Sequence, residues 1–555
     1  MNIKNIITIF CIFNSFSYSQ IEYFETKLPI IIIETYNQEI LDEPKVSAHM
    51  GIIFHEDGSI NKTTDYFNNY NGRIGIEIRG STSQNFPKKS FAIETWDSNN
   101  IEINASLLGL PEEGDWILYG PYSDKSLLRN VLTYEISRQL GDYASRTKFC
   151  ELILNSDYIG IYVLTEKLKR DKNRIDIAKL KQADIDGNEL TGGYVIKIDK
   201  TTGLYTSGWE SQFPPFEDAW QKIFYQYHSP KPNKMVSEQK QYIQNWIYNF
   251  ESVMYNERNS EIQNGYDWLD LESAVDYFLI SELVKNKDAY YASIFMYKDK
   301  DNNDPKLHLG PVWDINLSMG NNYDDAVRSP EGWRFEIPLS TWELNNSILN
   351  GPFWFNMLWE DSQFREMFKQ RWISERNNIL SNQNIINLIN QLSEELSGAV
   401  DRNFTRWEIL GIPVWPMTYY DHTNYVLDTY DDEVQYLKDW ITERLVWIDS
   451  IIENWSLKLN IADENIIQNV RIHQIYPNPS NSNIYIKLYV NQKEKVTLSI
   501  YDVKGRQVLS LYDDTVVSPG LKNIFVDTNI LGTGVYFVSL STQKYNKSQK
   551  FVILK

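Results

Sequence analysis

Cysteine usage sets the first limit on how this chain can fold. Only two cysteines, Cys11 and Cys150, occur in 555 residues, and Cys11 lies in an N-terminal segment that we expect to be removed. The remaining thiol then has no partner within the chain, so a disulfide framework is excluded. The mature protein must be stabilised by packing, for which 17 Trp, 36 Tyr and 24 Phe supply large side chains.

The first 19 residues predict a signal peptide for secretion. Lys4 supplies a positive charge, and residues 6–13 form an apolar run that is too short to span a bilayer. Small residues precede Gln20, which favours cleavage after Ser19. A buried N-terminal strand or helix explains this order of charge and apolar residues less well. No later stretch is apolar enough to cross a membrane, so we expect no transmembrane segment after cleavage.

The charge balance is strongly acidic. The formal net charge is −20, from 74 acidic and 54 basic residues. Phosphate backbones attract basic surfaces, so nucleic acid is excluded as a general partner. Six histidines are scattered without a metal-binding spacing, which argues against a zinc site.

Apolar periodicity indicates two domains of different class, since 555 residues exceed one ordinary core. Residues 20–460, with a core over residues 28–455, are predicted to form an α+β domain that is β-rich at its start and helical at its end. Residues 473–555 contain short alternating segments between Gly, Asn and Pro turns, which is typical of a small antiparallel β-sandwich. Residues 461–472 are interpreted as a linker.

A polar loop between two predicted strands is the first candidate binding element. Gly80, Ser81 and Ser83 lie in this loop, whose backbone N–H groups could contact phosphate. Lys88 and Lys89 follow the loop. Lys89 has the parity of the large apolar residues in the next strand, and a lysine among apolar neighbours needs an anion, so Lys89 is preferred. Two solvated surface lysines are the simpler explanation of this feature taken alone.

Two acidic positions are the second candidate. Asp288 lies on a loop after an amphipathic helix, where a carboxylate can act as a base toward a substrate hydroxyl. Asp314 and Asn316 follow a predicted hairpin. A carboxylate among apolar and aromatic residues requires a cation, and Mg²⁺ prefers carboxylate and amide oxygens. A helix cap or turn at Asp288 and a buried Arg–Asp pair at Asp314 remain open as structural explanations.

The order of these elements is similar to the layout of protein kinases. A loop is followed by a strand lysine, by Glu166 at the end of a strand, by Asp288 after a helix and by Asp314 after a hairpin. Protein kinases present a glycine-rich loop, a lysine, its paired glutamate, a catalytic aspartate and a metal-binding aspartate in the same order. The consensus kinase sequences themselves do not occur.

Several separated motifs make the similarity more specific. They are Arg79-Gly80-Ser81-Thr82-Ser83-Gln84, Phe86-Pro87-Lys88-Lys89-Ser90-Phe91, Trp116-Ile117-Leu118, Asp124-Lys125-Ser126-Leu127-Leu128-Arg129-Asn130, Gly160-Ile161-Tyr162-Val163-Leu164-Thr165-Glu166-Lys167, Asn286-Lys287-Asp288 and Gly310-Pro311-Val312-Trp313-Asp314-Ile315-Asn316-Leu317. In this order they resemble the CotH (spore-coat protein H) kinase family, over roughly residues 28–455.

This resemblance implies an atypical protein-kinase-like domain that is secreted and transfers phosphate from ATP to Ser residues of exported or surface proteins. Lys89 or Lys88 would hold the nucleotide phosphates, and Glu166 would orient that lysine. Asp288 would position or deprotonate the acceptor hydroxyl, and Asp314 would bind Mg²⁺.

The implied metal site departs from the family pattern at two positions. Asn316 stands where many relatives have a second acidic residue, which weakens the site by one charge. Ser293 falls where ordinary protein kinases place a metal-binding Asn. The resemblance therefore does not support a second magnesium ion.

The tail resembles the C-terminal sorting domain of the type IX secretion system of Bacteroidetes. The matching strings are Tyr476-Pro477-Asn478-Pro479, Ser499-Ile500-Tyr501-Asp502-Val503-Lys504-Gly505-Arg506 and Leu531-Gly532-Thr533-Gly534-Val535-Tyr536. The resemblance implies contact with the secretion machinery and a final location outside the cell or on its surface.

Two other functions remain open. A non-catalytic surface adhesin or scaffold on a kinase-like fold is compatible with Asn316. A kinase of glycan or small-molecule hydroxyls is also compatible, because related folds serve several acceptors.

Overall fold

The computed structural model describes residues 22–200, 207–216, 219, 222–337, 351–417, 426–459, 470–490, 493–518, 520–542 and 546–555. The chain divides into two compact units, residues 1–453 and 454–555. The expected signal peptide over residues 1–19 and most of the expected linker over residues 461–472 lie outside the described residues.

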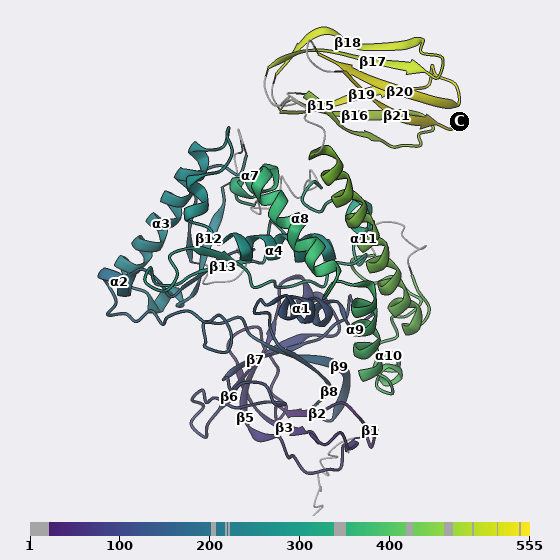
Figure 1. Ribbon diagram of the computed structural model, residues 1–555. Helices are drawn as coiled ribbons and strands as arrows, with labels where there is room; N and C mark the ends of the chain where they lie inside the picture. The colour runs from purple at the N-terminus through teal and green to yellow at the C-terminus, as the bar shows by residue number, and fades with distance from the viewer. Residues whose placement is uncertain are drawn as a thin grey trace, which may run out of the picture. The chain divides into compact units, whose positions relative to one another are not determined.

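Seven strands of the N-terminal region close into a barrel in the order β2-β3-β5-β6-β7-β9-β8 (Figure 1). Neighbouring strands are antiparallel except β2 and β8, whose parallel pairing closes the barrel. Ile33, Met50, Ile76 and Trp116 are fully buried in its core. The strands are β2 (Ile30–Glu34), β3 (Val46–Ile53), β5 (Tyr70–Arg79), β6 (Ser90–Trp96), β7 (Asp115–Tyr119), β8 (Thr147–Leu154) and β9 (Asp157–Glu166). The polar loop with Gly80, Ser81 and Ser83 thus lies between two strands, β5 and β6, as expected.

A second, five-stranded sheet has the order β11-β12-β10-β13-β14, and all its pairs are antiparallel. Its strands are β10 (Tyr194–Ile198), β11 (Gly208–Glu210), β12 (Phe224–Ser229), β13 (Ile294–Lys298) and β14 (Leu307–Leu309). The β13–β14 pair is the expected hairpin before Asp314.

Helices form most of the rest of this unit (Figure 1). Helix α4 (Leu271–Val284) begins with an N-cap hydrogen bond from Ser273 N–H to the Asp270 carboxylate, and every residue from Ser273 to Val284 is buried. The sequence predicted a one-sided amphipathic helix here; burial on all sides follows because α1, α8 and β14 all contact α4. The main helices are α1 (Arg129–Leu140), α3 (Ser237–Asn256), α4, α7 (Phe353–Glu360), α8 (Ser362–Arg376), α9 (Asn382–Glu395), α10 (Val400–Arg406) and α11 (Tyr430–Leu459); shorter elements are α2 (Gly187–Leu190), α5 (Asp325–Arg328), η1 (Thr82–Asn85), η2 (Pro232–Lys234), η3 (Asn264–Asp267), β1 (Glu25–Thr26) and β4 (Asn61–Lys62).

The C-terminal unit contains two antiparallel sheets, β15-β16-β19 and β18-β17-β20-β21. Ile484 and Ile486 from one sheet and Leu498 and Val538 from the other belong to one buried cluster, as expected for a β-sandwich. Its strands are β15 (Val470–Tyr476), β16 (Asn483–Val490), β17 (Glu494–Asp502), β18 (Gln507–Val517), β19 (Gly520–Asp527), β20 (Gly534–Ser541) and β21 (Asn546–Ile553).

The expected α+β class is confirmed, with a β-rich start, helices in the second half of the large unit and antiparallel sheets at the C-terminus. Among the described residues, no helix is both long and apolar enough to cross a bilayer.

Candidate functional site

Two loops carry the predicted acidic residues, and main-chain hydrogen bonds join them. The first loop follows α4, which ends at Lys285 in a left-handed conformation with φ of 49°. The second follows β14 and contains Asp314. Lys287 N–H donates to the Leu317 carbonyl at 2.9 Å, and Met319 N–H donates to the Val284 carbonyl at 2.8 Å. The two loops are therefore held together much as two short strands are.

Helix α1 holds the second loop from another side. Arg129 is 2% exposed and donates from Nε to the Ser318 carbonyl at 3.0 Å and from Nη2 to the Met319 carbonyl at 3.1 Å. Asn130 Oδ1 accepts the Ile315 N–H at 3.0 Å. The Asp124 carboxylate binds both the backbone N–H and the guanidinium of Arg129. This clamp explains why the Asp124–Asn130 motif stands at the start of the helix.

The backbone of Asp314 adopts a conformation that residues other than glycine rarely use. Its φ of 58° is left-handed, and its backbone N–H donates to the Tyr134 hydroxyl at 3.3 Å. The side chain is accessible to solvent but has dense protein around it. This desolvation, together with the charge of Asp288, raises the pKa of Asp314 to about 6. The two carboxylates that the sequence singled out are therefore close enough to interact.

Asp288 is half-buried, and its main chain is firmly bound. Its carbonyl oxygen accepts the N–H groups of Tyr291 at 3.1 Å and Ala292 at 2.9 Å. Arg334, which is 1% exposed, donates to the carbonyl oxygens of Asn286 and Lys287 just before it. The loop position of Asp288 thus follows from buried contacts on both sides.

The remaining polar groups near the pair come from three further segments. Asn316 Nδ2 lies 3.5 Å from Ser123 Oγ, and the Asn316 carbonyl accepts from Asn321 Nδ2 at 2.9 Å. Arg79, at the end of β5, lies over the Trp313 ring at 5.7 Å. The positive charges of Lys200 and Arg79 act on Asp314 and favour its ionised form.

These donors fit a magnesium ion. Among the described residues, the carboxylates of Asp288 and Asp314 accept no hydrogen bond and form no ion pair. Two adjacent, unpaired carboxylates repel each other, and a divalent cation with oxygen ligands would relieve that repulsion. Asn316 could add an amide oxygen.

Comparison with known families identifies the large domain. The family model described as CotH kinase protein matches residues 76–448, more than half of the chain. This chain belongs to the CotH kinase family. The model described as secretion system C-terminal sorting domain matches residues 474–554, which indicates type IX secretion to the cell surface or the extracellular space. No curated protein matches the chain significantly.

The lysines of this CotH-family protein do not lie where the sequence led us to expect. Lys89 Nζ donates to the Gln84 carbonyl at 2.6 Å. Lys88, which the sequence favoured less than Lys89, is the buried lysine, with 2% of its surface exposed. Its Nζ donates to Asn403 Oδ1 at 2.8 Å and lies over the Tyr162 ring. The parity argument failed because β6 begins only at Ser90, so neither lysine follows the alternation of the strand. Burial lowers the pKa of Lys88 to about 7.

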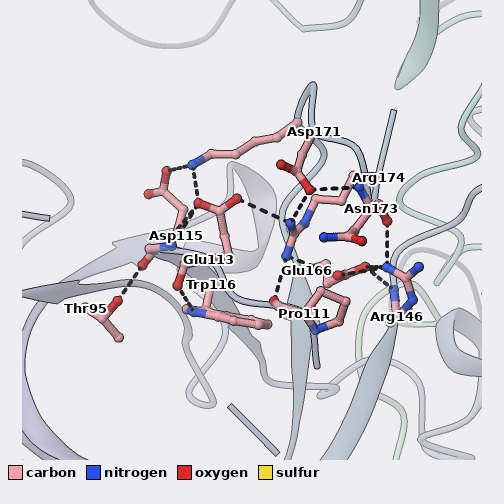
Figure 2. A network of polar contacts seen from close by, with 12 residues as sticks. Thr95, Pro111, Glu113, Asp115, Trp116, Arg146, Glu166, Asp171, Asn173 and Arg174 are labelled. Carbon is pink, nitrogen blue, oxygen red and sulfur yellow. Dashed lines mark hydrogen bonds and ion pairs between the residues drawn. The ribbon is translucent and has the colours of Figure 1, made fainter. Parts of the chain in front are cut away.

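Glu166 pairs with arginines instead of a lysine, as Figure 2 shows. Its fully buried carboxylate binds Arg146 at 3.1 Å and Arg174 at 3.1 Å, and Arg174 also contacts Asp171. The Lys89–Glu166 pair expected from the kinase layout is therefore not formed. Two arginines satisfy both carboxylate oxygens, which leaves no need for a lysine.

The predicted phosphate loop is folded on itself. Gly80 has φ of 113°, and a side chain there would meet Ser83 Oγ. The Gly80 carbonyl accepts from Gln84 Nε2 at 2.8 Å, while Gly80 and Ser81 are exposed. The loop follows directly on Arg79, whose charge acts on Asp314.

Sequence reasoning missed five residues around the acidic pair: Arg79, Arg129, Asn130, Tyr134 and Arg334. Arg79, Arg129 and Asn130 stand inside the motifs that carry the family resemblance, but those motifs did not indicate a contact with the acidic pair. Arg334 had no sequence signal, because its contacts are with backbone carbonyls distant in sequence.

Proposed function

We propose that this protein is a secreted, atypical protein kinase that transfers the γ-phosphate of ATP to Ser hydroxyls of exported or surface proteins. The observation that carries the proposal is the pair Asp288 and Asp314, two interacting carboxylates on hydrogen-bonded loops. Membership of the CotH kinase family supports a kinase-like phosphotransferase. In this proposal residues 20–460 form the kinase-like domain.

Asp314 and Asn316 would hold Mg²⁺. When bound, the ion would neutralise charge on the nucleotide phosphates, which is its usual contribution to phosphoryl transfer. The left-handed backbone at Asp314 and the α1 clamp would keep these oxygens in place before substrate binds. One carboxylate and one amide make a weaker site than two carboxylates would.

Asp288 would accept the proton of the acceptor hydroxyl. Its carbonyl and N–H are fixed by neighbouring backbone and by the Asn286 side chain, so the carboxylate is carried on an ordered loop. A positioned base of this kind contributes a factor of about 10² to 10⁴ in rate.

Arg79 and Lys200 are the first candidates for contacts with the nucleotide phosphates, because their charges already act on Asp314. Lys88 and Lys89 would reach a phosphate only by giving up their bonds to Asn403 and Gln84. Gly80, Ser81 and Ser83 would cover the phosphates from the loop beside Arg79.

Secretion has a consequence for this proposal. The type IX sorting domain directs the protein to the surface or beyond, where ATP is scarce. Phosphorylation would therefore take place on partners met during export, or with nucleotide released outside the cell.

The test uses purified protein without the signal peptide, ATP labelled in the γ-phosphate, Mg²⁺ and a Ser-rich acceptor. Label should appear on Ser of the acceptor or of the protein itself, and Asp288→Asn and Asp314→Ala should abolish it. Asp186→Asn is the matched control, because Asp186 is exposed and makes no side-chain contact among the described residues. Full transfer by both site variants would refute the assigned roles. Phosphate recovered on a sugar instead of Ser would indicate a glycan kinase.

A non-catalytic adhesin or scaffold is the second candidate function. It is favoured by the pairing of Glu166 with two arginines and by Asn316 at the metal position. A protein that binds no nucleotide gains no stability from it. If neither ATP nor ADP with Mg²⁺ raises the melting temperature, this reading replaces the kinase proposal.

A further inference from the structure

A basic pocket lies where the chain leaving β9 meets the start of β10 and the end of β12. Its cavity of about 220 Å³ is lined by five cationic side chains and by His228 and Ser229. The cations are Lys167, Lys169, Arg170, Lys179 and Lys231. Among the described residues, no carboxylate lines this cavity, which is unusual in a chain with a net charge of −20.

The cations differ in how they are balanced. Lys169 contacts Glu113 at 2.8 Å, Asp115 at 2.5 Å and Glu102 at 3.8 Å, and Lys167 contacts Asp115 at 3.6 Å. Within the described parts of the chain, the other three cations form no ion pair. Burial lowers the pKa of Lys167, and the charges of Lys231 and Lys169 lower it further. The Asp171 carboxylate interacts electrostatically with Arg170, and the pocket keeps its excess of positive charge at Lys179 and Lys231.

The residues that line the pocket are held by contacts that do not involve Arg170, Lys179 or Lys231. His228 Nε2 lies 2.8 Å from the Leu168 carbonyl, and burial lowers the pKa of His228 to about 4, so its ring is neutral. Figure 2 shows Glu113 and Asp115 beside the network that joins Arg174 to Glu166. These side chains are therefore already held in place before a ligand binds.

We propose that this pocket binds the phosphate group of a phosphomonoester or a pyrophosphate. Arg170 is half-buried and Lys179 and Lys231 are exposed, so together they present an open cationic surface, and an anion of more than one charge would balance them better than a single carboxylate. The guanidinium of Arg170 and the ammonium groups of Lys179 and Lys231 supply N–H donors from separate segments, which suits an anion with several oxygens.

The pocket is distinct from the acidic pair. Neither Asp288 nor Asp314 lines the pocket, although the charge of Asp199, just beyond β10, acts on both His228 and Asp314. The Asp314→Asn variant therefore tests whether a phosphate in the pocket is separate from the one that Asp288 and Asp314 would handle, and the proposal does not depend on kinase activity.

Binding is measured by calorimetry on the full mature chain in EDTA, with pyrophosphate in one arm and a phosphoserine peptide in the other. Lys231→Glu and Lys179→Glu should each weaken binding at least about tenfold, because each reverses one charge at the pocket wall. Lys234→Glu is the control: this exposed lysine is three residues from Lys231, carries the same charge and does not line the cavity. Equal melting temperatures establish that the variants are folded.

The arms separate the two sources of phosphate. Tight binding of the peptide but not of pyrophosphate identifies a phosphorylated protein as the ligand, and the reverse identifies a free phosphate compound. The proposal is overturned if neither binds, if the unphosphorylated or an Asp-substituted peptide binds equally well, or if Lys234→Glu weakens binding as much as Lys231→Glu. It is also overturned if Asp314→Asn abolishes binding, because the ligand then sits at the acidic pair. A chain that binds phosphate here but transfers none refutes only the proposed kinase function.

Discussion

The backbone N–H of Lys287 donates to the Leu317 carbonyl at 2.9 Å, and this bond links the loop of Asp288 to the loop of Asp314. The second link, from Met319 to Val284, makes the contact a short stretch of paired backbone. The carboxylates are thus positioned by main chain, and their side chains take no part in holding the loops together. Replacing either carboxylate should leave the fold intact, which makes both suitable for functional tests.

Asp288→Asn should lower phosphate transfer by at least about 100-fold, because the amide cannot accept the hydroxyl proton. Transfer to an acceptor peptide is followed with labelled ATP, and the melting temperature shows that the fold is unchanged. Asp186→Asn should retain full activity. Activity within twofold of the wild type in Asp288→Asn would remove Asp288 from the reaction.

Asp314 should make the metal-free protein less stable as the pH rises. Its pKa is raised from 3.8 to about 6, so the folded state binds this proton more tightly than the unfolded state does. That contribution to stability is complete below about pH 4 and is lost as the pH rises through about 6. In EDTA, Asp314→Asn should therefore melt above the wild type near pH 8 and together with it near pH 4.

Magnesium should reverse the order of the two melting temperatures near pH 8. Metal binding requires the ionised carboxylate, so Mg²⁺ should raise the melting temperature of the wild type only above about pH 6. Asp314→Asn should show little response at any pH. A wild-type response to Mg²⁺ that does not depend on pH would contradict a metal site at Asp314.

The α1 clamp should matter for both stability and activity. Arg129→Ala removes a buried cation from Asp124, takes one of two donors from the Ser318 carbonyl and removes the Arg129 donor of the Met319 carbonyl, which should cost about 3–5 kcal/mol. Tyr134→Phe removes only the hydroxyl that accepts the Asp314 N–H and should cost about 1 kcal/mol. Urea unfolding measures both. If Tyr134→Phe lowers Mg²⁺ affinity more than its small loss of stability accounts for, the hydroxyl positions the metal loop.

The sequence was sufficient to predict the α+β class and the hairpin before Asp314, and it singled out Asp288 and Asp314 as separate candidates. These depend on local patterns, namely alternation in strands, helix spacing and the order of motifs. The barrel was not foreseen, because the parallel pairing of Ile30 to Ile33 with Glu151 to Leu154 joins segments far apart in the chain. Nothing in either segment alone specifies that partner.

The preference for Lys89 over Lys88 and the expected pairing with Glu166 were wrong for a related reason. Strand parity fixes a face only inside a strand, and Lys88 and Lys89 stand before β6 begins. Glu166 ends β9 as expected, but Arg146 and Arg174 reach it from a preceding loop and a following loop. A competing cation of this kind cannot be seen from the spacing of one motif.

Glu166→Gln should therefore lower the free energy of unfolding and leave the affinity for ATP unchanged. The change removes the carboxylate charge from Arg146 and leaves Arg174 with Asp171 and Glu113 alone, and breaking a buried ion pair in this way costs about 3–5 kcal/mol. Denaturant unfolding measures the loss, and ATP affinity is measured under conditions where the variant is folded. Reduced ATP affinity with unchanged stability would restore the role of Glu166 as the partner of a phosphate-binding lysine.

Lys88→Met should stabilise the protein, and most strongly at low pH. Burial lowers the pKa of Lys88 from 10.5 to about 7, so the folded state resists protonation of this side chain. The resulting cost is full below about pH 7 and vanishes as the pH approaches the unfolded value. A shift of this size corresponds to about 5 kcal/mol, from which the lost hydrogen bond to Asn403 subtracts about 1–3 kcal/mol.

Urea unfolding of Lys88→Met near pH 6 and near pH 10 separates this effect from simple repacking, because better packing alone would stabilise equally at both values. Lys89→Met is the matched control, since Lys89 is only half-buried and donates to a backbone carbonyl. ATP with Mg²⁺ should stabilise the Lys88 variant as much as the wild type if Lys88 serves only the fold. Loss of that stabilisation in the Lys88 variant alone would instead identify Lys88 as the residue that moves to contact phosphate, because its present partner, Asn403, is a neutral amide that a phosphate could replace.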